Sequence, residues 1–101
     1  MGRSTIVIGG GLAGLAATAA LITRGLPVTL LEARPRWGGR ASSFTDYQTG
    51  EEIDNCQHVS MGCCTNLAHF CRLTGIDTAF QRQSQLWFVG PAGDITPFRA
   101  Q

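Results

Sequence analysis

The N-terminal part of the chain alternates short apolar runs with glycine-rich breaks. An apolar run at residues 6–8 leads into a cluster of glycines, then into an alanine-rich segment at residues 15–22 and a second apolar run, Val28–Leu31. Short apolar runs bounded by turn residues predict strands, and the alanine-rich segment predicts a helix. Gly25 and Pro27 mark the end of that helix. The pattern therefore predicts strand, tight turn, helix and strand, the βαβ unit of an α/β fold.

The rest of the chain predicts shorter elements separated by turn residues. Strands are predicted where β-branched and aromatic residues cluster, and a helix where apolar positions recur at helical spacing before a glycine. The elements expected there are, in order, strands at residues 44–47 and 51–53 around a turn at residues 48–50, a helix at Thr65–Thr74 that stops at Gly75, and a hairpin of Leu86–Val89 and Ile95–Phe98.

Gly9, Gly11 and Gly14 form a G-x-G-x-x-G pattern between the first predicted strand and the helix. Gly9 allows the backbone to turn sharply, Gly11 leaves room for a pyrophosphate, and Gly14 lets the helix pack closely on the strand. The helix N-terminus presents N–H groups and partial positive charge to the phosphates. Glu32, at the end of the second strand, can accept hydrogen bonds from both adenosine ribose hydroxyls, and its charge disfavours a 2′-phosphate. Together these residues predict a site for an adenine dinucleotide.

A second glycine motif follows Glu32 directly. Gly38 and Gly39 are flanked by Arg36 and Arg40. Adjacent glycines permit a backbone to approach a ligand closely, and an arginine there can reach a pyrophosphate. Taken alone, the same stretch is more typical of a glycine turn with solvated arginines than of a ligand site.

Together the two motifs resemble the N-terminus of the FAD-dependent amine oxidase and phytoene desaturase superfamily. The matching residues are Gly9, Gly11, Gly14, Glu32, Ala33, Arg34, Arg36, Gly38, Gly39, Arg40 and Ser43. The resemblance implies a Rossmann-like FAD-binding fold and makes FAD, rather than NAD, the expected cofactor. The expected cofactor-binding residues are Gly9, Gly10, Gly11, Leu12, Ala13, Gly14, Glu32, Ala33, Arg34, Gly38, Gly39, Arg40 and His58.

The segment from Asp54 to Gly75 narrows the resemblance to the squalene-associated FAD-dependent desaturases, also called hydroxysqualene dehydroxylases. Cys56 departs from the family pattern, which has glycine at this position. If the position needs positive φ, a cysteine costs on the order of 1 kcal/mol or more. His58 lies near the flavin by this resemblance, but it is equally typical of a structural histidine where a strand meets a loop.

The resemblance implies an incomplete Rossmann-like domain and a function for the longer protein that contains it. Residues 1–43 are expected to form the dinucleotide-binding unit, and residues 44–101 to begin the flavin-proximal, substrate-side segment. The expected function is FAD-dependent oxidation of an apolar isoprenoid such as hydroxysqualene, squalene or a carotenoid. A flavin amine oxidase is the alternative enzyme, and a non-catalytic nucleotide-binding remnant is the alternative of another class. No residue is a convincing catalytic acid or base.

Charge and cysteine usage exclude several other classes. The 101 residues carry a net charge of +1, which argues against nucleic acid or an anionic membrane surface as the partner. Without an export signal we expect a cytoplasmic protein with reduced thiols, and peripheral membrane contact of the intact enzyme stays open. The cysteines and histidines between Cys56 and Cys71 do not have the spacing of a zinc module, so no metal is expected. On the second helix we expect an apolar face of Cys64, Leu67, Ala68 and Cys71.

Overall fold

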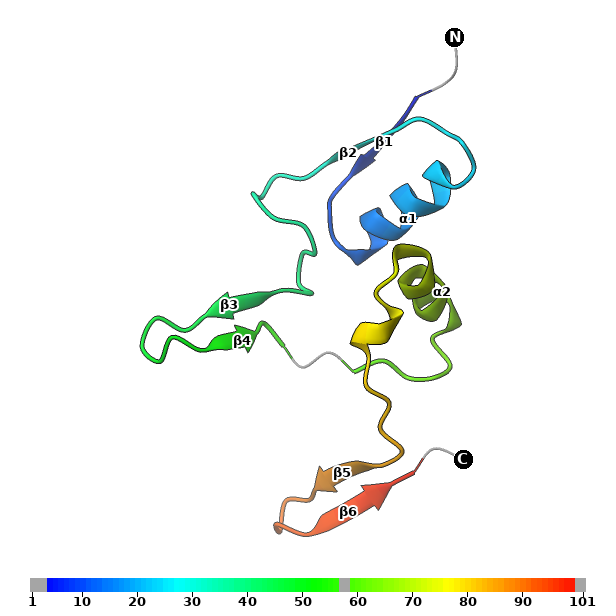
Figure 1. The fold of residues 1–101 in the computed structure, drawn as a ribbon. Helices are drawn as coiled ribbons and strands as arrows, with labels where there is room; N and C mark the ends of the chain where they lie inside the picture. The colour runs from blue at the N-terminus through cyan, green and yellow to red at the C-terminus, as the bar shows by residue number, and fades with distance from the viewer. Residues whose placement is uncertain (1–3, 57–58, 100–101) are drawn as a thin grey trace.

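The computed structural model describes residues 4–56 and 59–99 as an extended chain of small units (Figure 1). Its elements are, in order, β1 (Thr5–Ile8), α1 (Leu12–Ile22), β2 (Val28–Leu31), β3 (Ser43–Thr45), β4 (Glu52–Asp54), α2 (Thr65–Thr74), the 3₁₀ helix η1 (Asp77–Ala79), β5 (Leu86–Val89) and β6 (Ile95–Phe98). The strands form three separate two-stranded sheets, β1–β2, β3–β4 and β5–β6. The radius of gyration is 18.0 Å, whereas a compact domain of this length has about 13 Å.

The N-terminal βαβ unit confirms the predicted α/β fold. β1 and β2 pair in parallel, with Thr5 opposite Val28 and Ile8 opposite Leu31. α1 connects them and packs against both strands. Parallel sheets are normally covered on both faces, but along both strands half-buried residues alternate with exposed ones. Ile8, for example, is 85% exposed, so one face of this sheet has no covering element within the described residues.

The β3–β4 hairpin has strand ends within two residues of those predicted, and the largest difference, at the end of β3, has a local cause. β3 ends at Thr45, because the Asp46 carboxylate accepts hydrogen bonds from Gln48 N–H (3.3 Å) and Thr49 N–H (3.2 Å). This turn within the loop replaces strand pairing. The prediction that Tyr47 belongs to the strand was therefore wrong; Tyr47 lies in the loop and is completely exposed.

α2 has the predicted bounds and packs against α1. Gly75 ends it in the left-handed region at φ 74°, and η1 follows, which the sequence pattern did not predict. The predicted apolar face is only partly correct. Cys71 is buried at 3% exposure and Leu67 is half-buried, but Cys64 and Ala68 are exposed. Cys64 is the N-cap of α2, so it precedes the first turn of the helix.

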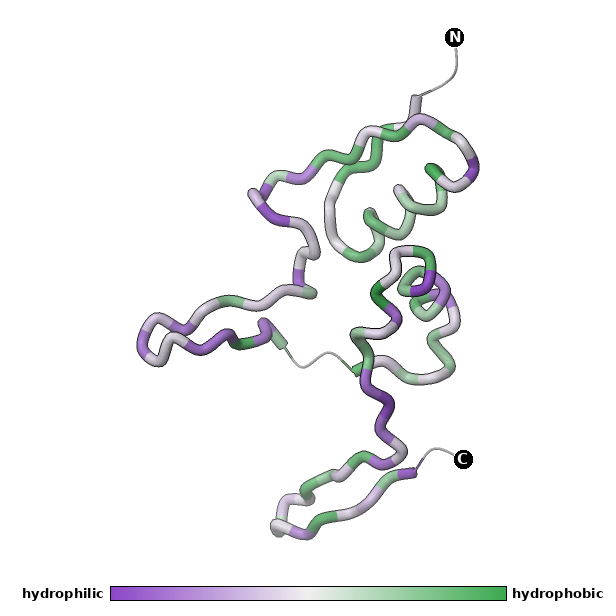
Figure 2. The backbone as a smooth tube through the Cα atoms, viewed as in Figure 1, coloured by the Kyte–Doolittle hydropathy of each residue, from purple (hydrophilic) through white to green (hydrophobic). Residues whose placement is uncertain are grey.

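The C-terminal hairpin pairs β5 with β6 in antiparallel register. A strongly hydrophilic segment, residues 81–85, separates it from η1, and apolar residues return along both strands (Figure 2). Every residue of β5 and β6 is exposed. No helix in the described ranges has both the length and the apolar character needed to cross a membrane.

Candidate dinucleotide-binding site

The loop between β1 and α1 is shaped by glycines that the backbone requires. Gly9 has φ 103°, a conformation that side-chain-bearing residues rarely adopt, and its N–H donates to the Leu31 carbonyl at 2.7 Å. A Cβ added at Gly14 would overlap the Gly9 carbonyl oxygen. Gly14 therefore brings the first turn of α1 directly against the end of β1, as the sequence pattern predicted.

Gly11 differs from these two glycines, because the protein itself does not require it to be a glycine. Its φ of −74° and ψ of 179° are ordinary extended values, and a Cβ added there would meet no atom within 4 Å. As the N-cap of α1 it offers no side chain to the helix, and the first turn contains no acidic residue. The N–H groups at the start of α1 thus have no side-chain cap, and the space above Gly11 is open.

The second glycine motif lies directly against the first. Gly38 N–H donates to the Gly10 carbonyl at 2.8 Å, and Gly11 and Gly38 form an isolated parallel bridge. Gly38 and Gly39 have φ of 107° and 62°, and a Cβ on Gly39 would lie 3.2 Å from the Gly11 Cα. The sequence pattern predicted that the doublet allows close backbone approach to a ligand, and this stays a prediction. In the structure the doublet lies against the backbone of the first glycine loop. The two loops are stacked beside the start of α1.

Glu32 connects the end of β2 to the glycine loop. Its Oε2 accepts a hydrogen bond from Gly10 N–H at 2.6 Å, and its Oε1 accepts one from Arg34 N–H at 2.9 Å. The Arg34 N–H, followed by that of Gly10, lowers the pKa of the Glu32 carboxyl below its usual value. A carboxylate has about four acceptor positions, so both oxygens can still accept bonds from ribose hydroxyls.

The arginines that flank the doublet have different surroundings. Arg36 Nη1 donates to the Ser43 carbonyl at 3.1 Å, so the structure places this guanidinium on β3 and not toward the glycine loops. Arg40 is exposed, and its carbonyl accepts a hydrogen bond from Asn55 Nδ2 at 3.2 Å. Asn55 N–H also donates to the Ser42 carbonyl at 2.8 Å. The end of β4 therefore holds the segment that carries Arg40.

Most of the predicted site residues lie around these loops. Leu12 and Ala13 begin α1, and Ala33 and Arg34 follow β2. His58 lies outside the described residues. Sequence reasoning missed Asn55, which holds the Arg40 segment, and Trp37, whose ring lies against Gly10. A tryptophan directly before a glycine doublet was a usable signal; the role of Asn55 depends on a contact 15 residues away along the chain.

The expectation that the cysteines bind no metal stays a prediction. In the described parts of the chain, no three His, Cys, Asp or Glu side chains are grouped closely enough to hold a metal ion. Cys56 has no positive φ, since every residue with positive φ in residues 4–56 and 59–99 is a glycine. The backbone strain expected if Cys56 had to adopt a glycine conformation is therefore not present.

A family model described as an NAD(P)-binding Rossmann-like domain matches residues 7–73. The match begins within β1 and ends within α2, and so includes both glycine loops and Glu32.

Three kinds of curated relative are similar to the chain. A zeta-carotene desaturase of Zea mays is 41% identical over 90 residues, which are 88% of this chain and 16% of the relative. A hydroxysqualene dehydroxylase of Sinorhizobium fredii is 33% identical over 98 residues, 97% of this chain and 22% of the relative. Polyamine oxidase 5 of Oryza sativa subsp. japonica is 47% identical over 75 residues, 72% of this chain and 15% of the relative.

Among solved structures, putrescine oxidase bound to putrescine aligns with a TM-score of 0.67 and 27% identity over 99% of this chain and 22% of its own. The chain thus spans about a fifth of the length of the proteins that it matches. The shared part is the dinucleotide-binding region.

Proposed function

The chain belongs to the NAD(P)-binding Rossmann-like domain family, as the N-terminal region of the amine oxidase and carotenoid desaturase group, and from this premise we propose that it binds the ADP half of FAD. Gly11 and the start of α1 would hold the pyrophosphate, and Glu32 would hold the adenosine ribose. When bound, the flavin supplies the redox chemistry. This chain's residues hold the cofactor and neutralise its phosphates.

Gly11 is the observation that carries this proposal. The backbone does not require glycine there, and no protein atom occupies the space that a side chain would fill. Glycine at such a position is explained by a ligand that approaches the main chain. The uncapped start of α1 supplies N–H donors and partial positive charge at the same point.

Glu32 is the residue proposed to bind the adenosine ribose. Its lowered pKa keeps the carboxylate ionised at neutral pH, so it accepts hydrogen bonds from the ribose hydroxyls. The same negative charge repels a 2′-phosphate, which favours FAD over a phosphorylated dinucleotide. Arg40, exposed beside the glycine doublet, adds positive charge for the pyrophosphate.

For the longer protein we propose an FAD-dependent oxidoreductase that acts on an apolar isoprenoid of the hydroxysqualene, squalene or carotenoid type. The similarity to a carotene desaturase and a hydroxysqualene dehydroxylase over most of this chain supports it. The exposed aromatic residues of β5 and β6 are suited to an apolar substrate cavity. We place this enzyme in the cytoplasm, with peripheral membrane contact for substrate access and without a nucleic-acid partner.

A flavin amine oxidase is the second candidate. It is supported by the 47% identity to a polyamine oxidase and by the alignment with putrescine oxidase. The two candidates differ in the substrate domain: an aromatic cage suits an amine, and a long apolar tunnel suits a polyene. Oxidation assays of the longer protein with putrescine and with hydroxysqualene separate them.

A non-catalytic nucleotide-binding remnant is the alternative of another class. We expect the 101-residue chain to show no turnover and to lose FAD during gel filtration, because much of its apolar surface is uncovered. A yellow, stoichiometric monomer eluting from the column would contradict this expectation.

A substitution at Gly11 tests the binding proposal directly. Gly11→Ala should leave the far-UV circular dichroism unchanged and weaken ADP binding by about tenfold or more, because the added methyl group occupies the pyrophosphate space. Gly62→Ala is the matched control, since Gly62 also has open space around it and no positive φ. Equal ADP affinity of the two variants in equilibrium titration would contradict the proposed site.

A further inference from the structure

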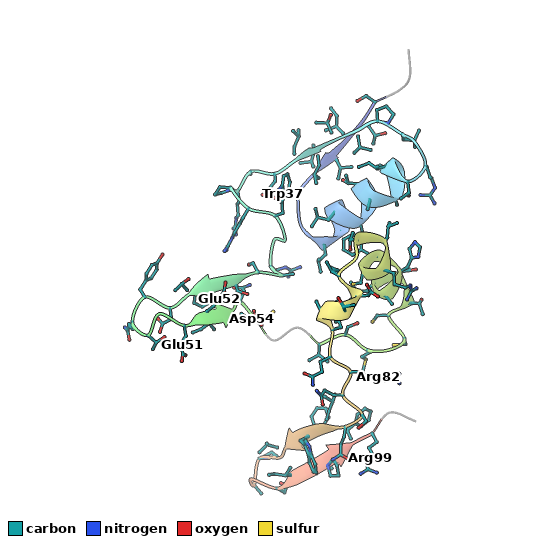
Figure 3. The ribbon with its side chains drawn as sticks, viewed as in Figure 1. Trp37, Glu51, Glu52, Asp54, Arg82 and Arg99 are labelled. Atoms are coloured by element: carbon teal, nitrogen blue, oxygen red, sulfur yellow. The ribbon has the colours of Figure 1, made fainter. Side chains whose placement is uncertain are left out.

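Trp37 lies in the segment between β2 and the glycine doublet, and its ring is packed against the first glycine loop. A Cβ added at Gly10 would overlap the indole at Cε3 and lie 2.9 Å from Cζ3. It would also lie 3.0 Å from Glu32 Oε2. Figure 3 shows the Trp37 side chain between the segment after β2 and the loop that joins β1 to α1. The indole, the Gly10 backbone and the Glu32 carboxylate therefore form one cluster.

This contact explains why residue 10 is a glycine. Gly10 is buried, and its φ is not in the positive region that requires glycine. The space beside its Cα is instead filled by Trp37 and Glu32. A side chain at Gly10 would therefore require the Trp37 and Glu32 side chains to shift, although the φ of Gly10 is not positive.

Packing against Gly10 buries only part of the indole. Trp37 remains 55% exposed, beside the carboxylate that would bind the ribose. An adenine ring attached to a ribose held at Glu32 would lie near this exposed aromatic surface. Purine bases stack favourably on such surfaces, independently of hydrogen bonding.

We propose that Trp37 is a ligand-contacting residue of the adenosine subsite, with the adenine ring packed on its exposed surface while Glu32 holds the ribose. The inference rests on the proposed dinucleotide binding and extends it to a named adenine contact. It makes binding sensitive to the base, whereas the contacts at Gly11 and Arg40 are sensitive only to the phosphates.

Fluorescence of Trp37 itself tests the contact without altering it. The sequence has two tryptophans, Trp37 and Trp87, so Trp87→Phe leaves Trp37 as the single tryptophan emitter. Titration with ADP should quench or shift its emission and protect it from acrylamide, whereas inorganic pyrophosphate should do neither. ADP that binds by equilibrium dialysis without changing Trp37 emission would overturn the adenine contact. Absence of ADP binding would instead overturn the proposed function, and this inference with it.

Substitutions separate an aromatic contact from simple packing. Trp37→Phe keeps an aromatic surface and should bind ADP within about threefold of the parent chain, whereas Trp37→Leu should bind it about tenfold more weakly. Pyrophosphate affinity should be the same in all three. Equal ADP affinity for Trp37→Leu and the parent would reduce Trp37 to a packing role and overturn the proposal.

A size exchange checks the packing on which the inference depends. Gly10→Ala should lower the thermal midpoint, and the double variant Gly10→Ala/Trp37→Ala should recover part of the loss, because the smaller side chain vacates the overlapping space. If the decreases in thermal midpoint caused by Gly10→Ala and Trp37→Ala simply add in the double variant, the indole does not occupy the space beside Gly10, and the proposal is overturned.

Discussion

The βαβ unit with its stacked glycine loops and the β5–β6 hairpin both consist largely of apolar residues, but of these two regions only the first packs against a further helix in the described parts of the chain. Its α1 contacts α2 as well as β1 and β2, and Gly38 N–H donates to the Gly10 carbonyl. Within the described residues, β5 and β6 contact no helix or strand outside their own hairpin. Inside the hairpin, the rings of Phe88 and Phe98 pack edge to face, with their centroids 6.0 Å apart.

The difference shows how far the structure of each region depends on packing against other parts of a protein. The glycine loops obtain their shape from backbone conformation and from hydrogen bonds among nearby segments, so the proposed ADP-binding surface can form within this chain. The hairpin is paired along its backbone, yet its apolar side chains remain exposed, Trp87 by 63%. An isolated two-stranded hairpin is at best marginally stable in water. Its structure therefore depends on packing partners, whereas that of the loops depends on residue type.

The largest effect should come from Gly14→Ala. The added methyl group would overlap the Gly9 carbonyl oxygen, which cannot move away as a flexible side chain could. We expect a loss of up to about 3 kcal/mol in the free energy of unfolding and no measurable ADP binding. Urea titration followed by circular dichroism measures the first quantity and isothermal calorimetry the second. Gly11→Ala, three residues earlier in the same motif, is the control that should keep its fold. Similar unfolding curves for both variants would remove the distinction between structural and ligand-required glycines.

The next effect concerns Glu32. Glu32→Ala removes charge-assisted hydrogen bonds to the ribose, so ADP affinity should fall by about ten- to a hundredfold. Glu51→Ala changes an exposed carboxylate in the β3–β4 loop and should leave affinity unchanged (Figure 3). ADP titrations of the parent, Glu32→Ala and Glu51→Ala measure these affinities. If Glu32→Ala binds ADP as tightly as the parent, the proposed dinucleotide site loses its basis.

Glu32 also predicts a pH dependence. Its folded-state pKa is lowered by the Arg34 and Gly10 N–H groups. Its contribution to stability is therefore fully present above the usual carboxyl pKa of about 4.3 and is lost as the pH falls through the lower folded-state value. Thermal midpoints of the parent and Glu32→Gln should converge over that acidic range. A constant difference between them down to strongly acidic pH would mean that the carboxylate is not held by these donors.

A smaller effect is expected at Arg40. Because Arg40 is exposed, its attraction to the pyrophosphate is screened by water, and Arg40→Ala should weaken ADP binding about two- to fivefold. The loss should shrink at high salt. Arg82→Ala, in the segment between η1 and β5, removes the same charge away from the loops (Figure 3). If both variants lose equal affinity, Arg40 acts only through net charge.

The smallest effect is expected in the hairpin. Trp87→Ser should change ADP affinity by less than about twofold, as is usual for substitutions away from a site. It should also reduce binding of a hydrophobic dye, because it removes a large exposed aromatic surface. Fluorescence titrations with ADP and with the dye measure both. A substantial loss of ADP affinity would show that the hairpin supports the glycine loops, contrary to the comparison drawn above.

Much of the fold and most of the glycine-loop site could be predicted from the sequence alone, because the information is local. Gly9 adopts positive φ, Gly14 is required by close packing, and Gly75 ends α2 in the left-handed region. Each of these depends on a residue type and on its position relative to a strand or helix a few residues away. The spacing of apolar residues that predicts a strand or a helix also involves only residues close together in the sequence. For this reason α2, β5 and β6 have the predicted bounds.

Only the tertiary structure decided the contacts between segments distant in the sequence. The packing of Trp37 on Gly10, the approach of Gly39 to Gly11 and the bond from Asn55 to the Arg40 carbonyl all depend on how the loops after β1, β2 and β4 meet. The position of Arg36 on β3 and the exposure of Cys64 depend on packing in the same way. A local pattern specifies which conformations a residue can adopt, but not which distant side chain will fill the space beside it.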